Sequence, residues 1–332
     1  MIDAADRAST ASSARSSWAR WALPITWALM PFVAGTAFGD ALATTSRSVQ
    51  VVASVGLWLV WAAVLGAMLV PRTVTLTAVR IVVPAAIPAL AWTFFLRTEI
   101  TQTLGGEPPR LVTEAAPIEG GRALSLLLGL GLALLVSVLV LSAPVGDVFA
   151  NGSSYGDERR MLLRPPTALL LGPVELAWAA CVAGVVAGPL LLAASVWVPG
   201  VVVLAIGWPL AFVAARALHG LARRWVVFVP AGFVLHDLSV MTEALLLPRK
   251  MVRHLGPALA DTRATDLTAG ALGLALQADL TEPTPITPAG GRAARTGRGT
   301  PDAAIEISSF LFSPSRPGAL LREARARRLA VD

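Results

Sequence analysis

The sequence predicts an α-helical membrane bundle of about six transmembrane helices, followed by a C-terminal α+β domain. Residues 20–216 are long apolar runs with almost no interior charge, whereas residues 217–332 have the mixed texture of a soluble domain. Hydrophobic residues make up 55% of the 332-residue chain and charged residues 14%, with a mean hydropathy of +0.68. A soluble domain of this length cannot hide so much apolar surface, so the bilayer must be the solvent for the first part.

The apolar runs are long enough for single membrane crossings, which need about 18 to 25 residues each. A short N-terminal segment, residues 1–19, precedes them, and we expect it to be disordered and cytoplasmic. The predicted spans are residues 20–40, 49–70, 74–96, 123–144, 167–193 and 197–216.

The positions of the arginines predict the orientation of the six spans in a bacterial plasma membrane. Basic residues gather in alternate connections, which by the positive-inside rule lie in the cytoplasm. Both termini are then cytoplasmic, and the loop 145–166 is a cytoplasmic connection. These arginines are Arg7, Arg15, Arg20, Arg72, Arg159, Arg160, Arg164, Arg216, Arg223 and Arg224.

An alternative reading removes the first span. The triplet Ala41-Leu42-Ala43 follows a basic segment and an apolar stretch, as a signal-peptidase site does. Cleavage after Ala43 would leave five spans. The apolar stretch is long for a signal peptide and contains Pro31, so a signal-anchor helix is the preferred interpretation.

Ionisable residues deep in the spans need an explanation, because a lone charge at bilayer depth is costly. Arg80 and Glu175 fall six to eight residues into the third and fifth predicted spans, both of which start at the cytoplasmic side. The two side chains are therefore candidates for an intramembrane ion pair. In the alternative, Arg80 reaches the headgroups with its guanidinium while Glu175 is protonated or bonded to a neighbouring helix.

The fifth span also carries small residues one turn apart, at Ala180, Gly184 and Gly188. Such a series lets two helix backbones approach closely, so these residues form a candidate helix-packing face. Its partner is a helix of the same bundle or a second copy of the chain. Pro84 and Pro88 predict a kink in the third span, and broken helices of this kind also occur in transporters.

The C-terminal domain begins with a predicted β-hairpin, residues 225–229 and 233–237, with Pro230-Ala231-Gly232 at the turn. Further strands are expected at 242–248, 251–256, 271–280 and 305–312. Ser315 is expected to cap a last helix, in which Leu320, Leu321, Ala324 and Arg328 share one face. Strands followed by a closing helix predict a small barrel or sandwich.

This element order, together with Leu247-Pro248-Arg249-Lys250-Met251-Val252 at a strand end, resembles the bacterial pleckstrin-homology-like (PH-like) domain. The resemblance covers about a third of the chain and implies a PH-like fold with a cytoplasmic location. The whole chain is also similar to actinobacterial polytopic membrane proteins of uncharacterised activity, a group that implies no mechanism.

The segment 281–302 departs from the PH-like pattern. It is dense in Pro, Gly, Thr and Ala, so it cannot bury enough apolar surface to fold alone, and we expect a flexible insertion. Its arginines, Arg292, Arg295 and Arg298, are candidates for contact with anionic lipid headgroups. In the alternative they only solubilise the surface. Residues 216–332 carry 15 basic and 10 acidic residues, a surplus that favours an anionic partner.

No motif for catalysis, metal binding or cofactor binding stands at a useful position, so we expect no enzyme, metal or cofactor. The basic residues lack interleaved aromatic residues, which argues against nucleic acid as a partner. The leading hypothesis is a membrane scaffold whose PH-like domain binds a protein partner or the inner leaflet. The alternatives are a small-solute transporter or channel that uses the helix bundle and an enzyme acting on lipid.

Overall fold

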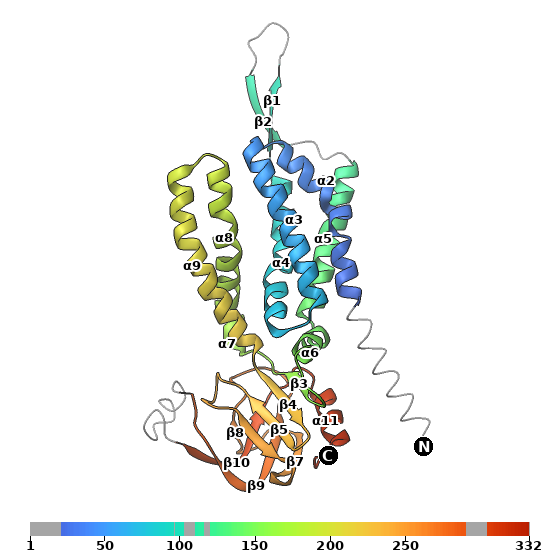
Figure 1. Cartoon of the computed structure of the whole chain (residues 1–332), viewed down its shortest axis with the longest axis vertical. Helices are drawn as coiled ribbons and strands as arrows, with labels where there is room; N and C mark the ends of the chain where they lie inside the picture. The colour runs from blue at the N-terminus through green and yellow to red at the C-terminus, as the bar shows by residue number, and fades with distance from the viewer. Residues whose placement is uncertain (1–20, 96, 103–109, 116–119, 290–303, 332) are drawn as a thin grey trace, which may run out of the picture. The chain divides into compact units, whose positions relative to one another are not determined.

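The computed structural model describes residues 21–331, except 96, 103–109, 116–119 and 290–303 (Figure 1). The chain divides into two compact units, and each is made of several chain segments. The helical unit contains residues up to 70, 78–145 and 179–215. The α+β unit contains residues 71–77, 146–178 and 216–332. The last segment of the α+β unit begins at residue 216, and two earlier segments of the chain also belong to this unit.

Within the described residues, six helices are long and apolar enough to cross a membrane, which confirms the predicted number of spans. Large apolar side chains on these helices are exposed, as Phe212 and Leu127 are, because lipid rather than protein is their expected surrounding. The chain is therefore a multi-pass membrane protein. The helices are α2 (Met30–Ala43, in a span that begins at Trp21), α3 (Arg47–Leu69), α4 (Thr73–Phe95), α5 (Gly120–Leu141), α8 (Pro173–Ala193) and α9 (Trp197–Ala222).

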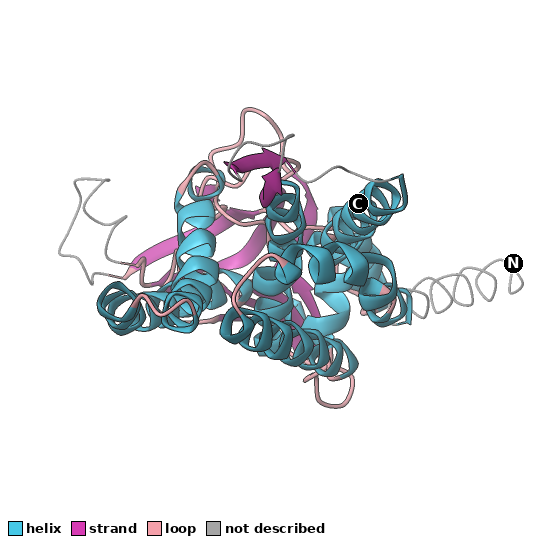
Figure 2. Ribbon diagram, turned by 90° about the horizontal axis from the view of Figure 1, so that it is seen from above, coloured by secondary structure: helices cyan, strands magenta, loops and turns pink. Residues whose placement is uncertain are grey.

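Side-chain hydrogen bonds join the first helices of the helical unit, seen nearly end-on in Figure 2. Trp27 Nε1 donates to the carbonyl oxygen of Trp61 at 3.0 Å, and Trp61 Nε1 donates to that of Trp27 at 3.3 Å. Ser125 Oγ of α5 donates to the carbonyl oxygen of Val33 in α2 at 2.7 Å. Such bonds are favoured where no water competes for them.

Helices α8 and α9 approach each other through glycine. A Cβ atom on Gly184 would lie 2.5 Å from the carbonyl oxygen of Gly207, and one on Gly188 would lie 2.8 Å from Leu204 Cα. The small residues of the fifth span thus face α9 of the same chain. Cys181, one turn away, is buried, and its Sγ donates to the carbonyl oxygen of Ala211 at 3.4 Å.

The fifth span starts later than the predicted residue 167. A short helix, α7 (Thr167–Leu170), comes first, and Gly172 then adopts a φ of +138°, a conformation that favours glycine. Pro173 follows as the first residue of α8, where its fixed φ and missing N–H suit a helix start. Pro173 therefore begins this helix and does not bend it.

A β-hairpin occupies part of the connection between the third and fourth predicted spans. Strands β1 (Arg97–Gln102) and β2 (Arg110–Ala115) pair antiparallel, with Arg97 opposite Ala115 and Gln102 opposite Arg110. The hairpin belongs to the helical unit.

The α+β unit contains two four-stranded sheets. The first is an antiparallel meander of β3 (Arg159–Leu162), β4 (Trp225–Val229), β5 (Gly232–His236) and β6 (Leu245–Pro248). The second has the order β7-β9-β10-β8, in which β8 runs parallel to β10. Its strands are β7 (Val252–Pro257), β8 (Thr265–Asp266), β9 (Leu276–Ile286) and β10 (Ile305–Phe312), and a 3₁₀ turn, η1 (Arg249–Met251), links β6 to β7.

One hydrophobic core lies among these strands. Phe228 and Phe233 of the first sheet and Phe310 and Phe312 of the second are its largest side chains, and all are almost fully buried. Leu320 of the last helix, α11 (Pro317–Ala326), is also fully buried in this core. The predicted strands with a closing helix are therefore confirmed, but the described strands form two sheets and not a closed barrel.

The largest difference from the sequence analysis is in residues 145–166, which were interpreted as a connecting loop. Helix α6 (Ala143–Asn151) extends into this segment, and strand β3 lies within it and pairs with β4 from Arg159 opposite Phe228 to Leu162 opposite Trp225. The cause is non-local, because β3 gains its order from a partner strand that follows two membrane spans later in the chain.

Three smaller expectations for the C-terminal part were wrong. Ser315 does not cap α11, because its Oγ donates to the carbonyl oxygen of Leu162, and the N-cap residue is Arg316. Arg328 lies beyond the helix with a φ of +59°. Strand β9 runs on to Ile286, where it pairs with Ile305, so the expected insertion does not begin at 281.

The glycine contact between α8 and α9 yields the first prediction. Gly184→Ala should lower the thermal midpoint of the full-length protein in detergent, because the new methyl group forces two helix backbones apart. Overpacking of this kind costs about 1–3 kcal/mol. Gly56→Ala is the matched control, since nothing lies within 4 Å of that added atom, and it should leave the midpoint unchanged or raise it. Equal effects of the two substitutions would refute the close packing of α8 on α9.

Candidate functional site

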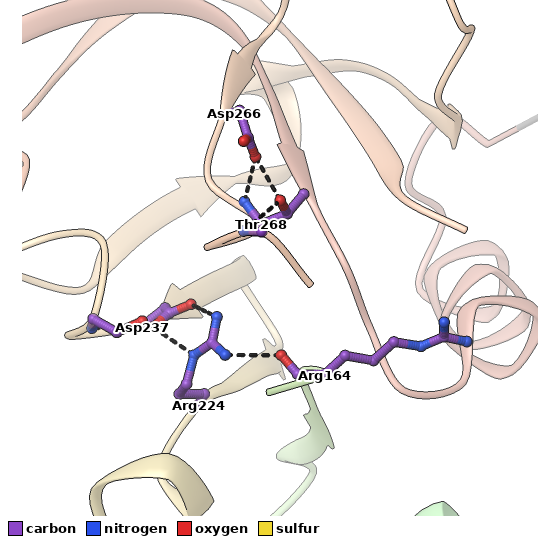
Figure 3. Close-up of polar contacts among 7 residues, drawn as sticks. Arg164, Arg224, Asp237, Asp266 and Thr268 are labelled. Carbon is purple, nitrogen blue, oxygen red and sulfur yellow. Dashed lines mark hydrogen bonds and ion pairs between the residues drawn. The ribbon is translucent and has the colours of Figure 1, made fainter. Parts of the chain in front are cut away.

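A buried ion pair lies at the start of the first sheet of the α+β unit. Arg224, directly before β4, donates from Nε to Asp237 Oδ1 at 2.9 Å and from Nη2 to Oδ2 at 2.6 Å (Figure 3). The side chains are 3% and 0% exposed. The planar guanidinium matches the carboxylate in a two-bond arrangement, the geometry in which such pairs are strongest.

The remaining bonding capacity of the pair is used within the same unit. Arg224 Nη1 donates to the carbonyl oxygen of Arg164 at 2.8 Å, and the backbone N–H and Oγ of Ser239 both donate to Asp237 Oδ1. The pair therefore ties the end of the 146–166 segment to the β4–β5 hairpin. Because both of its carboxylate oxygens accept hydrogen bonds, Asp237 is suited to holding the structure of this region.

A second carboxylate fastens α6. Asp147 Oδ2 accepts a hydrogen bond from Arg316 at 3.0 Å, and its Oδ1 accepts one from the backbone N–H of Leu162 at 3.3 Å. Burial raises the pKa of Asp147 above its usual 3.8, although Leu162 and Arg316 oppose this shift. Asn151, at the end of α6, bonds to the N–H and the carbonyl oxygen of Arg160. Segment 146–166 is thus bonded at both ends to the C-terminal segment of the same unit, through Arg316 and Arg224.

The third segment of the unit, residues 71–77, is fixed by two contacts. Thr77 Oγ1 and His219 Nδ1 share a hydrogen bond of 2.9 Å. Gly152 lies so close to Pro71 that a Cβ atom would overlap the proline's carbonyl oxygen. All three segments of the α+β unit are therefore held together by specific side chains.

A ring stack covers the outer side of the first sheet. The rings of Trp225 and His236, opposite each other on β4 and β5, lie 5.3 Å apart and nearly parallel, and the Arg160 guanidinium lies 5.6 Å from the Trp225 ring. His236 Nε2 is buried without a hydrogen-bond partner. Burial lowers the pKa of His236 below 6.5, and the charges of Arg223 and Arg160 lower it further against the opposing effect of Asp237.

In the described part of the chain, no group of three or more His, Cys, Asp or Glu side chains is placed to hold a metal ion. His254 pairs instead with Asp279 at 3.4 Å, between the neighbouring strands β7 and β9.

The structure places the two intramembrane candidates as follows. Arg80 Nε donates to the carbonyl oxygen of Val140 at 3.2 Å, which links α4 to α5. Glu175 lies in the first turn of α8, where its Oε2 accepts the N–H of Gly172 at 2.9 Å, as acidic residues at helix starts commonly do. An ion pair between Arg80 and Glu175 stays a prediction.

The remaining candidates are the helix-packing residues and the three arginines proposed to contact lipid. Gly184 and Gly188 lie against α9, and Ala180 is one turn before them on α8. Arg292, Arg295 and Arg298 lie outside the described residues, so their contact with anionic lipid stays a prediction.

The sequence analysis missed the ion pair because it interpreted Arg224 only as an orientation signal. A usable signal was present in the hairpin. Phe233 and Leu235 alternate along β5 and Asp237 directly follows it, so the period of two puts Asp237 on the same face as the two core residues. A carboxylate on a core face requires a cationic partner.

No protein-family model, no curated protein and no solved structure matches this chain.

The buried pair yields a prediction about stability. Arg224→Met or Asp237→Leu alone should destabilise the protein by about 3–5 kcal/mol, because each leaves one charge buried without its partner. The double variant should recover most of that loss. The measurement is the thermal midpoint of the four full-length proteins in detergent. Glu323→Gln, which removes a partly exposed pair with Arg327, is the control and should change the midpoint little. Additive losses in the double variant would contradict the coupling.

The lowered pKa of His236 yields a prediction about pH. The neutral ring is favoured in the folded state, so its contribution is present above pH 6.5 and is lost as the pH falls through the lower folded-state pKa. The thermal midpoint should therefore fall on acidification below pH 6.5. His236→Phe keeps an aromatic ring on Trp225 and should reduce this fall. An identical pH dependence in wild type and variant would exclude His236 as its source.

Proposed function

We propose that the protein is a non-enzymatic integral membrane scaffold whose α+β unit, a PH-like domain, binds a protein partner or the inner leaflet of a bacterial plasma membrane. The proposal rests on which chain segments make up this unit. Its three segments, 71–77, 146–178 and 216–332, include residues of the second and fourth connections of a six-span chain and the segment that follows its last span. Successive spans alternate in direction, so these connections emerge on one side of the membrane.

Several features support a binding role over catalysis. Several of the polar groups that the α+β unit gathers bond to one another, as in the pair of Arg224 with Asp237 and that of Asp147 with Arg316. Such networks make a domain rigid and specific in shape, which is what a binding surface requires. The arginine distribution supports a cytoplasmic location of this unit, with both termini inside.

The test captures partners from crosslinked native membranes. Removing the residues after Arg224 is unsuitable, because it would leave β3 and α6 without their partners. The sharper comparison uses wild type, Asp237→Leu and the double variant Arg224→Met with Asp237→Leu, at equal membrane abundance. We expect specific partners with wild type, their loss with the single variant, and their return with the double variant.

Two results would contradict the scaffold function. One is an empty capture profile with all three proteins, which would direct attention to transport through the helix bundle. The other is an identical set of partners with all three, which would assign binding to the helical unit.

A further inference from the structure

An exposed group of leucines lies where two segments of the α+β unit meet. Leu272 and Leu274 are 72% and 50% exposed, and Leu171 of the segment before α8 is 80% exposed. We call residues 266–274 the leucine loop. Soluble surfaces carry single exposed leucines without consequence, but a contiguous apolar group marks a surface that something covers.

Hydrogen bonds join the leucine loop to the segment that leads into α8. The backbone N–H of Leu272 donates to Thr167 Oγ1 at 3.0 Å, and Arg164 Nη1 donates to the carbonyl oxygen of Leu272 at 2.8 Å. The backbone N–H of Thr167 donates in turn to the carbonyl oxygen of Gly270. The leucine loop is therefore fixed to the segment that carries the exposed Leu171.

The loop has a defined conformation that its sequence requires. Asp266 Oδ1 accepts hydrogen bonds from the N–H and Oγ1 of Thr268, as Figure 3 shows. Gly270 and Gly273 have φ values of +73° and +109°, and a Cβ atom on Gly273 would overlap Arg164 Nη1. The leucines are thus presented by a fixed turn.

The chain itself indicates which partner covers this surface. Thr167, to which the loop is bonded, is six residues before Pro173, where a candidate membrane span begins. An extended chain covers at most about 3.5 Å per residue, so Thr167 lies within about 20 Å of that point, and the helical turn of α7 shortens the distance. The exposed Leu171 is closer still. The bilayer expected around the span that begins at Pro173 is therefore the apolar phase for which these side chains are candidates.

We infer that the leucine loop inserts Leu272 and Leu274 into the interfacial region of the bilayer and forms one membrane-contact surface with Leu170 and Leu171. The inference rests on the proposed function only in placing the α+β unit at a membrane surface. The contact is apolar, so it needs no anionic lipid, unlike the contact predicted for the arginines of segment 281–302. Interfacial apolar groups typically reach about 5–10 Å into the boundary between headgroups and acyl chains.

The experiment uses the full-length protein in nanodiscs of neutral phosphatidylcholine. Leu272→Cys in a Cys181→Ala background is labelled with an environment-sensitive fluorophore, and quenching is compared between lipids brominated near the headgroup and aqueous iodide. Leu246→Cys is the matched control, because Leu246 is a 54% exposed leucine on β6 of the other sheet. A second labelled variant, Leu274→Cys, repeats the measurement if the first fails to fold.

We expect the Leu272 label to show blue-shifted emission with strong quenching by bromine and little by iodide, and the Leu246 label to show the reverse. Equal iodide quenching of both labels would overturn the inference. So would a Leu272 label that is accessible to iodide in nanodiscs but protected in native membranes, because a protein would then cover the loop. The nanodisc assay contains no partner protein, so its outcome is independent of the capture experiment.

Discussion

The α+β unit depends on the buried pairing of Arg224 with Asp237. Either charge alone would be costly at this depth, because removing an ion from water costs several kcal/mol unless a partner and further hydrogen bonds replace the solvent. Here they do so with two bonds between the charges and with donors from Ser239. Arg224 stands two residues after the end of α9, and Asp237 directly follows β5. The pair therefore fixes the start of the first sheet within the α+β unit.

This constraint also explains why the α+β unit cannot fold from the residues after the last membrane span alone. Arg224 Nη1 bonds to the carbonyl oxygen of Arg164, and β3 is the edge strand of the first sheet. Residues 146–166 can therefore reach their final structure only after the residues that follow the next two spans have been synthesised. Contacts between such distant segments are slow to form, because the entropy of closing the intervening loop must be overcome first. A truncation at the apparent domain boundary therefore damages both parts of the unit.

The elements that the sequence predicted are those with local signals, and the elements that it did not predict depend on distant parts of the chain. The spans, the β4–β5 hairpin and strand β10 carry their own signals, namely length and apolarity for the first and a period of two for the others. Strand β3 has only four residues and begins with Arg159 and Arg160, so nothing local distinguishes it from a charged turn. The period of two in the hairpin could have marked Asp237 as a core-facing carboxylate, but its partner Arg224 was interpreted only as an orientation signal, because a basic residue after a span also fits that role.

The two contacts with lipid that this chain suggests have different physical origins. Arginines such as Arg292 would act through charge, which counterions screen over about 8 Å at physiological ionic strength. Leucines on a turn shaped by Gly270 and Gly273 act through removal of apolar surface from water, which moderate salt does not weaken. A unit held at the bilayer by leucines keeps its orientation when the charge of the leaflet changes. Charged segments elsewhere on the same unit then remain free to respond to that change or to a protein partner.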